Sequence, residues 1–140
     1  MKLYYSVFVF LVAFSLVSCQ PKEVDANLEN STELSQEMSE ISLIYFHGDR
    51  RCPTCIAVGE VAEKTYFENF SDNEKIQFLE INIDLQENEA IAEKYEIAGS
   101  SLILDIQGKV EDITSFAFQN AKSNPELIEK KIIQLVKSGL

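Results

Sequence analysis

The hydrophobic residues of this chain fall into short runs that predict alternating strands and helices. Residues 41–46 (ISLIYF) form a continuous apolar run that ends at His47 and Gly48, which is typical of a strand buried on both faces. Residues 52–70 carry apolar side chains at roughly helical spacing, with Pro53 in the first turn, where proline is tolerated. The pattern therefore predicts a central strand that is followed directly by a helix.

The same alternation continues to the end of the chain. Further strands are expected over residues 75–83, 101–106 and 112–118. Further helices are expected over residues 88–95 and 126–140, the last of them capped by Asn124-Pro125-Glu126. Gln107-Gly108-Lys109 is a tight-turn signal that joins the last two strands as an antiparallel hairpin. The order β-α-β-α-β-β-α predicts an α/β fold with a four-stranded mixed sheet, flanked by helices, over residues 41–140.

The N-terminal part of the chain has a different pattern. After Lys2, residues 3–17 are almost wholly apolar, and this run is somewhat short for a permanent membrane span but typical of a signal peptide. Leu16-Val17-Ser18-Cys19 resembles the lipobox of bacterial lipoprotein signal peptides. The resemblance implies that residues 1–18 are removed, that Cys19 is lipidated, and that the exported chain is anchored to a bacterial membrane on its periplasmic or cell-surface side. Residues 19–40 are acidic and poor in aromatic residues, which indicates a tether.

Composition and charge narrow the classes of partner. Hydrophobic residues make up 46% of the chain and charged residues 25%, as in proteins that form a packed core. The net charge of −11 repels phosphate backbones, so we expect no nucleic-acid partner. Acidity by itself favours a role in solubility over the binding of a cationic partner.

The motif that carries chemistry is Cys52-Pro53-Thr54-Cys55, at the junction of the first strand and the first helix. Unpaired N–H groups at a helix N-terminus stabilise a thiolate, and cysteines there have pKa values of about 3.5 to 7.5 against about 8.5 for free cysteine. Cys55 lies one helical turn further on, within reach of the first sulfur. We therefore expect Cys52 to attack a partner sulfur and Cys55 to break the mixed disulfide that results.

Two kinds of neighbour accompany the motif, and each has two interpretations. In one interpretation, Arg50 and Arg51 lower the pKa of the Cys52 thiol and favour the dithiol form. In the other, they are solvated loop arginines. His47 is the only histidine in the chain. In one interpretation, His47 exchanges protons with either sulfur. In the other, it makes a structural hydrogen bond at the strand end.

These segments resemble a known family. The CPTC motif and residues 81–104 (INIDLQENEAIAEKYEIAGSSLIL) resemble thioredoxin-like proteins. More narrowly, Tyr45-Phe46-His47-Gly48 followed by Arg51-Cys52-Pro53-Thr54-Cys55 is similar to small thioredoxin-like lipoproteins labelled nitrophenyl compound nitroreductase subunits. The resemblance implies a thiol–disulfide oxidoreductase of the cell envelope, with protein or small-molecule thiols and disulfides as substrates and a redox partner that recycles it. No segment resembles a flavin site, so we expect no cofactor and do not carry over the nitroreductase activity.

The chain departs from the family at three positions. Ser100-Ser101 stands where thioredoxins place a cis-proline that presents backbone to the substrate, and a cis bond before serine costs about 2.5 to 4 kcal/mol, so we expect a trans loop. Arg51 stands where a tryptophan usually precedes the first cysteine, and the first strand lacks the family's buried acid. Help with proton transfer would come from His47 or from water.

Three alternatives to redox turnover remain open. A C-x-x-C bridge could be structural, although so small a ring stabilises little. Metal delivery through Cys52, Cys55 and His47 would need more ligands than the motif offers, and we expect no metal. A degenerate binding module is favoured by Ser101 and disfavoured by the intact motif. The expected site comprises the catalytic residues Cys52 and Cys55 and the supporting residues His47, Arg51, Pro53, Thr54 and Ser101.

Overall fold

The computed structural model describes residues 39–140. The elements in chain order are β1 (Ile41–His47), α1 (Pro53–Asn69), β2 (Ile76–Asn82), the 3-10 turn η1 (Gln86–Asn88), α2 (Glu89–Lys94), β3 (Ser101–Ile106), β4 (Lys109–Asp112), α3 (Thr114–Asn120) and α4 (Pro125–Gly139). The expected signal peptide, Cys19 and nearly all of the tether lie outside the described residues. In the described part, no helix has the length and apolar character that a membrane span requires.

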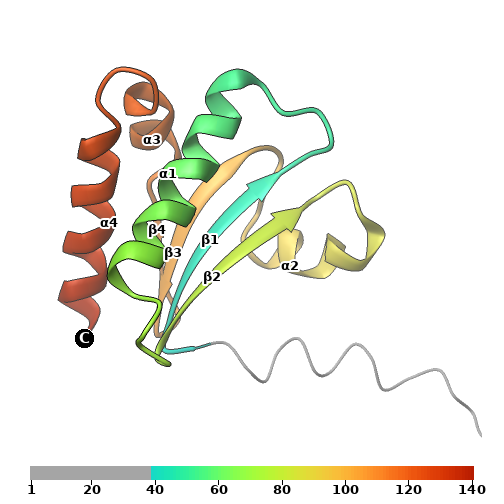
Figure 1. Ribbon diagram of the computed structural model, residues 1–140. Helices are drawn as coiled ribbons and strands as arrows, with labels where there is room; N and C mark the ends of the chain where they lie inside the picture. Colours follow the sequence, from blue (N-terminus) through green and yellow to red (C-terminus); the bar gives the residue numbers. More distant parts are fainter. Residues whose placement is uncertain (1–38) are drawn as a thin grey trace, which may run out of the picture. The chain divides into compact units, whose positions relative to one another are not determined.

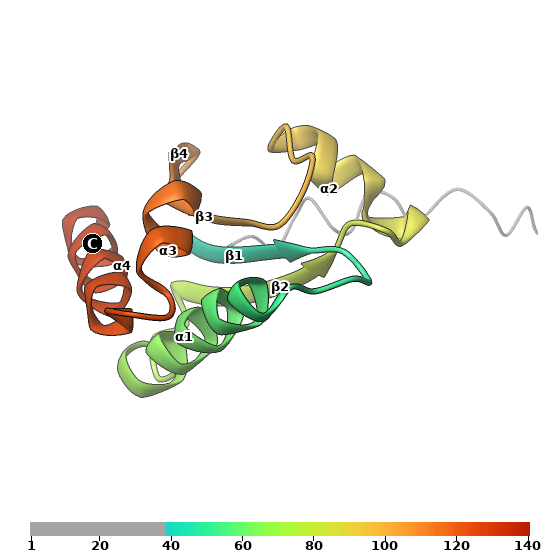
Figure 2. The ribbon, with the colours of Figure 1, turned by 90° about the horizontal axis from the view of Figure 1, so that it is seen from above.

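The four strands form one mixed sheet in the order β2-β1-β3-β4. β1 is parallel to β2, while the β1–β3 and β3–β4 pairs are antiparallel. Figures 1 and 2 show α1 and α2 on opposite faces of this sheet. The α/β class, the four-stranded mixed sheet and the flanking helices are therefore as the sequence predicts.

The side chains of β1 alternate between two apolar clusters, which explains why the whole strand reads as hydrophobic. Leu43 and Tyr45 point into the larger cluster with residues of α1, α3 and α4. Ile44 and Phe46 point into a smaller cluster that includes Tyr95, next to α2. β1 is therefore covered on both faces, and its C-terminal end leads into the loop that carries Cys52.

The sequence prediction is wrong for residues 112–118, which were expected to form the fourth strand. β4 ends at Asp112, and Thr114 begins the helix α3 instead. The Asp112 carboxylate accepts a hydrogen bond of 2.8 Å from the Thr114 backbone N–H, which turns the chain out of the strand. The apolar face of the segment then repeats every four residues, through Ile113, Ala117 and Ala121, all buried. The observed order therefore contains an additional helix between the hairpin and α4.

Of the predicted turn at residues 107–109 and the predicted helix cap at Asn124, the structure has only the turn. Gln107 and Gly108 both have positive φ values, of 53° and 87°, as a two-residue hairpin turn between β3 and β4 requires. α4 begins at Pro125, one residue before the predicted start at 126, and the Asn124 side chain makes no capping hydrogen bond.

Candidate active site

Cys52 occupies the N-cap position of α1, directly before Pro53. Its Sγ accepts a hydrogen bond of 3.0 Å from the backbone N–H of Cys55, and its side chain is exposed. A sulfur in this position receives both an N–H dipole and the positive end of a 17-residue helix. The arrangement stabilises negative charge on Cys52 and leaves it open to a partner.

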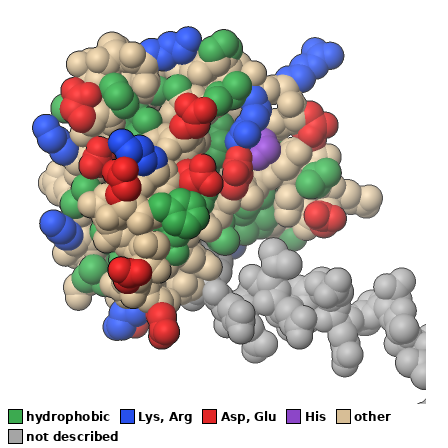
Figure 3. Space-filling model, viewed as in Figure 1, with side chains coloured by type: hydrophobic (Ala, Val, Ile, Leu, Met, Phe, Trp, Pro, Cys, Tyr) green, Lys and Arg blue, Asp and Glu red, His purple; other side chains and the backbone are tan. Residues whose placement is uncertain are grey.

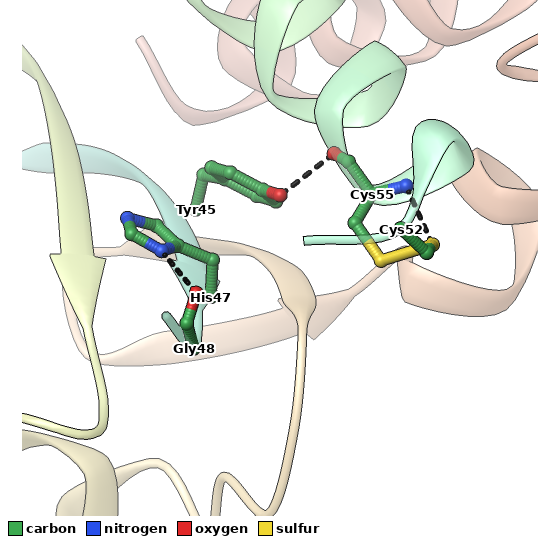
Figure 4. Close-up of a disulfide and its surroundings, with 5 residues drawn as sticks. All are labelled: Tyr45, His47, Gly48, Cys52 and Cys55. Atoms are coloured by element: carbon green, nitrogen blue, oxygen red, sulfur yellow. Dashed lines mark hydrogen bonds between the residues drawn. A yellow bond between two sulfur atoms is a disulfide. The ribbon is translucent and has the colours of Figure 1, made fainter. Parts of the chain in front are cut away.

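Cys55 lies one turn further on and is buried, with 8% of its surface exposed. The two cysteines form a disulfide, with their Cα atoms 5.0 Å apart (Figure 4). The pair is therefore asymmetric, because Cys52 is an exposed residue and Cys55 is buried in the first turn of α1. This asymmetry suits an attacking thiol at Cys52 and a resolving thiol at Cys55.

Tyr45 lies between the strand and the helix at this point. Its hydroxyl donates a hydrogen bond of 2.7 Å to the backbone carbonyl of Cys55 (Figure 4). The ring packs against Gly59 so closely that an added Cβ would lie 2.6 Å from Tyr45 Cε1. Burial raises the pKa of Tyr45, and Arg51 opposes that rise. The phenol therefore remains a neutral hydrogen-bond donor at physiological pH.

The Arg51 side chain has two partners although the residue is exposed. Its guanidinium donates a hydrogen bond to Glu80 Oε1 and forms an ion pair with it. It also lies over the Tyr45 ring, 5.4 Å from the ring centroid. Because Glu80 compensates its charge, Arg51 contributes less positive potential at Cys52 than an unpaired guanidinium would. Arg50, its neighbour, is exposed.

His47 makes polar contacts through both ring nitrogens. Nδ1 donates to the Gly48 carbonyl oxygen at 3.0 Å, and Nε2 lies 3.4 Å from Glu80 Oε1. The imidazole stacks on Tyr45, with ring centroids 5.7 Å apart. In Figure 4 the Tyr45 ring lies between His47 and the cysteine pair. This geometry fits the structural interpretation of His47 better than direct proton exchange with a sulfur.

The remaining expected site residues lie at the same end of the sheet. Pro53 starts α1, and Thr54 is half-buried in its first turn. Ser101 begins β3 opposite Phe46, near the end of β1, and its hydroxyl donates to the Gly99 carbonyl at 3.1 Å. No peptide bond in residues 39–140 is cis, so the bond before Ser101 is trans as expected.

The loop that carries Cys52 is hydrogen-bonded to the end of β2 and to the residues that follow it. The Asp49 backbone N–H donates to Asp84 Oδ2 at 2.7 Å, and the Asn82 side-chain amide donates to Asp49 Oδ1 at 2.8 Å. These bonds fix the start of the loop three residues before Cys52.

This chain resembles known proteins in its structure. No protein-family model and no curated protein matches the sequence. Human ERp44 superposes with a TM-score of 0.52 and 18% identity, over 77% of this chain and 28% of ERp44. Thioredoxin of Malassezia sympodialis superposes with a TM-score of 0.52 and 19% identity, over 76% of this chain and 86% of the thioredoxin. The fold is thioredoxin-like.

Within this thioredoxin-like fold, the cysteine pair lies at the junction of β1 and α1 as the sequence predicts. In residues 39–140 no group of three or more histidine, cysteine or acidic side chains is arranged to hold a metal ion. The similarity covers only 28% of the ERp44 chain, so it concerns less than a third of that protein's length.

Three residues around the cysteines were not predicted from the sequence, namely Tyr45, Gly59 and Glu80. One signal was present, because a tyrosine inside a buried apolar strand requires a partner for its hydroxyl. Glu80 is opposite Tyr45 in the β1–β2 register, but the partner of Arg51 only becomes evident once that register is known. Gly59 reads as an ordinary helical glycine until the packing of Tyr45 against it is seen.

Proposed function

We propose that this chain is a thiol–disulfide oxidoreductase that works through Cys52 and Cys55. The observation that carries the proposal is the asymmetry of the pair at the N-terminus of α1. Cys52 is exposed and accepts a helix N–H, whereas Cys55 is buried behind it. A purely structural bridge between residues only three apart stabilises little and has no need of an exposed sulfur at a helix terminus.

The reaction starts from the dithiol form of the protein. The Cys52 thiolate attacks one sulfur of a partner disulfide, so the partner's S–S bond breaks and its other sulfur leaves as a thiolate that takes a proton from solvent. Cys55 then gives its proton to solvent and attacks Cys52 Sγ, which releases the partner's second sulfur as a thiolate. Two electrons move from the protein to the partner, and the Cys52–Cys55 disulfide remains.

The reverse sequence oxidises a partner dithiol when the protein starts as the disulfide. Both directions use the same two sulfur atoms, and the reduction potential of the pair relative to its surroundings decides between them. A second thiol or disulfide partner must restore the starting form after each turnover. We propose protein or small-molecule thiols and disulfides as substrates, with no further cofactor.

A turnover assay on the full chain tests the proposal. We expect the wild-type chain to accelerate the reduction of insulin by a dithiol, and Cys52→Ser to abolish this activity. Cys55→Ser should accumulate mixed disulfides, because the first step is intact and the second is missing. Equal inactivity of all three proteins would contradict redox function and favour a binding module.

We also propose that the chain acts in the cell envelope, exported and lipid-anchored to a bacterial membrane through Cys19. The support is the resemblance of residues 16–19 to a lipobox. Mass spectrometry of the mature protein should show an N-terminal cysteine carrying a diacylglycerol group. Cys19→Ser should move the chain from the membrane fraction to the soluble fraction, and an unchanged distribution would contradict the anchor.

A further inference from the structure

A groove of about 750 Å³ lies between the end of β2 and α2, outside the cysteine site. Its apolar lining includes Ile83, Leu85 and Ile97. Leu85 keeps 45% of its surface exposed, while Ile83 and Ile97 pack against the smaller core cluster. The groove therefore offers apolar surface to a partner.

The charged side chains that line the groove are all acidic: Asp84, Glu89, Glu93 and Glu96. Among the described residues that line it there is no lysine or arginine. The lysine of α2, Lys94, extends instead toward Tyr95, 3.2 Å from its hydroxyl, and lies 3.8 Å from Asp105. In Figure 3, which has the view of Figure 1, acidic and hydrophobic side chains lie near each other on the side of the molecule where α2 lies.

Glu96 is held at the groove in an unfavourable backbone conformation. It has a φ of 56°, in the left-handed region that favours glycine, directly after α2 ends. The Ile97 N–H donates to the Ala92 carbonyl at 2.9 Å, a bond that ends the helix. Glycine is the usual residue at the position that Glu96 takes in such a helix end. Folding stability alone would favour glycine at this position.

One end of the groove, at Ile83 and Asp84, is hydrogen-bonded to the loop that carries Cys52. The backbone N–H of Ile83 donates to the His47 carbonyl at 2.8 Å, and Asp84 accepts from the Asp49 N–H at 2.7 Å. A partner segment that leaves the groove at Asp84 would thus reach the loop three residues before Cys52. Both features of the groove, its apolar lining and its uniform negative charge, would contact that segment.

We infer that this groove selects partners whose disulfide is flanked by a positively charged segment with aliphatic residues. The inference rests on the proposed function and names the class of substrate for it. Carboxylates at the rim attract lysine and arginine side chains and raise the rate of encounter. The apolar lining of Leu85 and Ile97 accepts the aliphatic side chains, so a flexible cation without them should bind less well.

The test uses three synthetic peptides that share one intramolecular disulfide and differ only in the flank. One flank carries lysine and leucine, one glutamate and leucine, and one lysine and glycine. For the full wild-type chain we expect kcat/KM for the lysine–leucine peptide to exceed that for the glutamate–leucine peptide by about tenfold at low salt. The difference should shrink as added salt screens the charges, and the lysine–glycine peptide should fall between the two.

Two pairs of substitutions separate the groove from the overall negative charge of the protein. The variant Glu89→Gln with Glu93→Gln should lose most of the preference for the lysine–leucine peptide. The variant Glu126→Gln with Glu129→Gln removes the same charge from α4, which packs in the other core cluster, and should keep the preference. Equal losses in both variants would show a general charge effect and overturn the inference.

Glu96→Gly tests whether Glu96 contributes to the preference for the lysine–leucine peptide and not only to the end of α2. Glycine relieves the left-handed strain, so we expect a higher melting temperature together with a weaker preference for the lysine–leucine peptide. A rise in stability with the preference unchanged would contradict a role of Glu96 in the groove.

Binding of unreactive peptides keeps this inference distinct from the redox proposal. Peptides in which serine replaces both cysteines should bind the wild-type chain in the same order of flanks, measured by fluorescence anisotropy. Reaction with all three disulfides at equal rates and equal binding would overturn the groove alone. No reaction with any disulfide would overturn the oxidoreductase proposal, whatever the binding result.

Discussion

The hydroxyl of Tyr45 lies 2.7 Å from the backbone carbonyl of Cys55 and donates a buried hydrogen bond to it. This bond joins the central strand to the first turn of the helix that carries Cys55. Tyr45 also contacts His47 and the guanidinium of Arg51. The residue therefore connects β1, the active-site loop and α1 at one point.

Tyr45→Phe removes this bond and keeps the ring. Leaving a buried carbonyl without one of its donors should lower the free energy of unfolding by about 1 to 2 kcal/mol. Because the first turn of α1 is then less firmly placed, we expect mixed disulfides to persist several times longer, with the initial attack by Cys52 unchanged. Rapid-quench kinetics with thiol trapping measures both steps.

Tyr66→Phe is the matched control for that experiment. The Tyr66 hydroxyl donates to a strand carbonyl, that of Ile76, at 3.4 Å, but away from the cysteines. It should leave the lifetime of the mixed disulfide unchanged. Similar kinetics in the two variants would mean that Tyr45 has no positioning role.

Gly59→Ala should destabilise the fold although alanine favours helices. An added Cβ would lie 2.6 Å from the Tyr45 ring, so either the ring or α1 must shift. Overpacking of this kind lowers stability by about 1 to 3 kcal/mol. Gly99→Ala is the control, since nothing lies within 4 Å of its added Cβ. Urea unfolding that ranks Gly99→Ala as the more damaging variant would contradict this packing.

The charge of Arg51 is compensated by Glu80, and this leads to a prediction about Cys52. Arg51→Ala should change the rate of Cys52 alkylation only slightly, because it removes a guanidinium that is already paired. Glu80→Gln should clearly raise the rate of Cys52 alkylation, because the Arg51 guanidinium then acts without its carboxylate partner. A stopped-flow comparison at neutral pH decides between them, and a large loss of rate in Arg51→Ala alone would show that Arg51 acts directly on the thiolate.

A second buried tyrosine makes stability depend on alkaline pH. Burial and the carboxylate of Asp105 raise the pKa of Tyr95, and its hydroxyl donates to that carboxylate at 2.6 Å. Because the pKa is higher in the folded than in the unfolded protein, where it is about 10, this contribution is complete below that pH and is lost as the pH rises above it. The free energy of unfolding should therefore fall above about pH 10.

Tyr95→Phe should weaken that alkaline fall while lowering stability at neutral pH by about 1 to 3 kcal/mol, since Asp105 loses a donor. Chemical unfolding at several pH values between neutral and strongly alkaline measures both effects. A variant with the same alkaline slope as wild type would show that Tyr95 is not the group responsible.

Much of the fold follows from local pattern. The run of residues 41–46 predicts a strand covered on both faces because both alternating sets of side chains are apolar. Residues 112–118 misled the prediction because isoleucine, threonine and phenylalanine are typical of strands. The deciding contact there is the Asp112 carboxylate with the Thr114 N–H, which stops the strand.

The cysteine motif could be placed from the sequence because proline and the end of the apolar run mark the start of a helix. The surroundings of the motif could not, since they depend on the register between β1 and β2. That register sets Tyr45 opposite Glu80, and Glu80 in turn binds Arg51 and contacts His47. The same strand end brings Asp84 to the active-site loop from 35 residues away in the chain.

The account depends most on Cys52 being the reactive thiolate and Cys55 the shielded thiol. The direct measurement is the rate at which each cysteine of the reduced full chain is alkylated as a function of pH, followed by mass spectrometry of the two sites. We expect Cys52 to react first, and at pH values where a free cysteine, with a pKa of about 8.5, is mostly protonated. Equal rates for the two cysteines, or no reaction of Cys52 until the pH approaches that of a free thiol, would contradict the account.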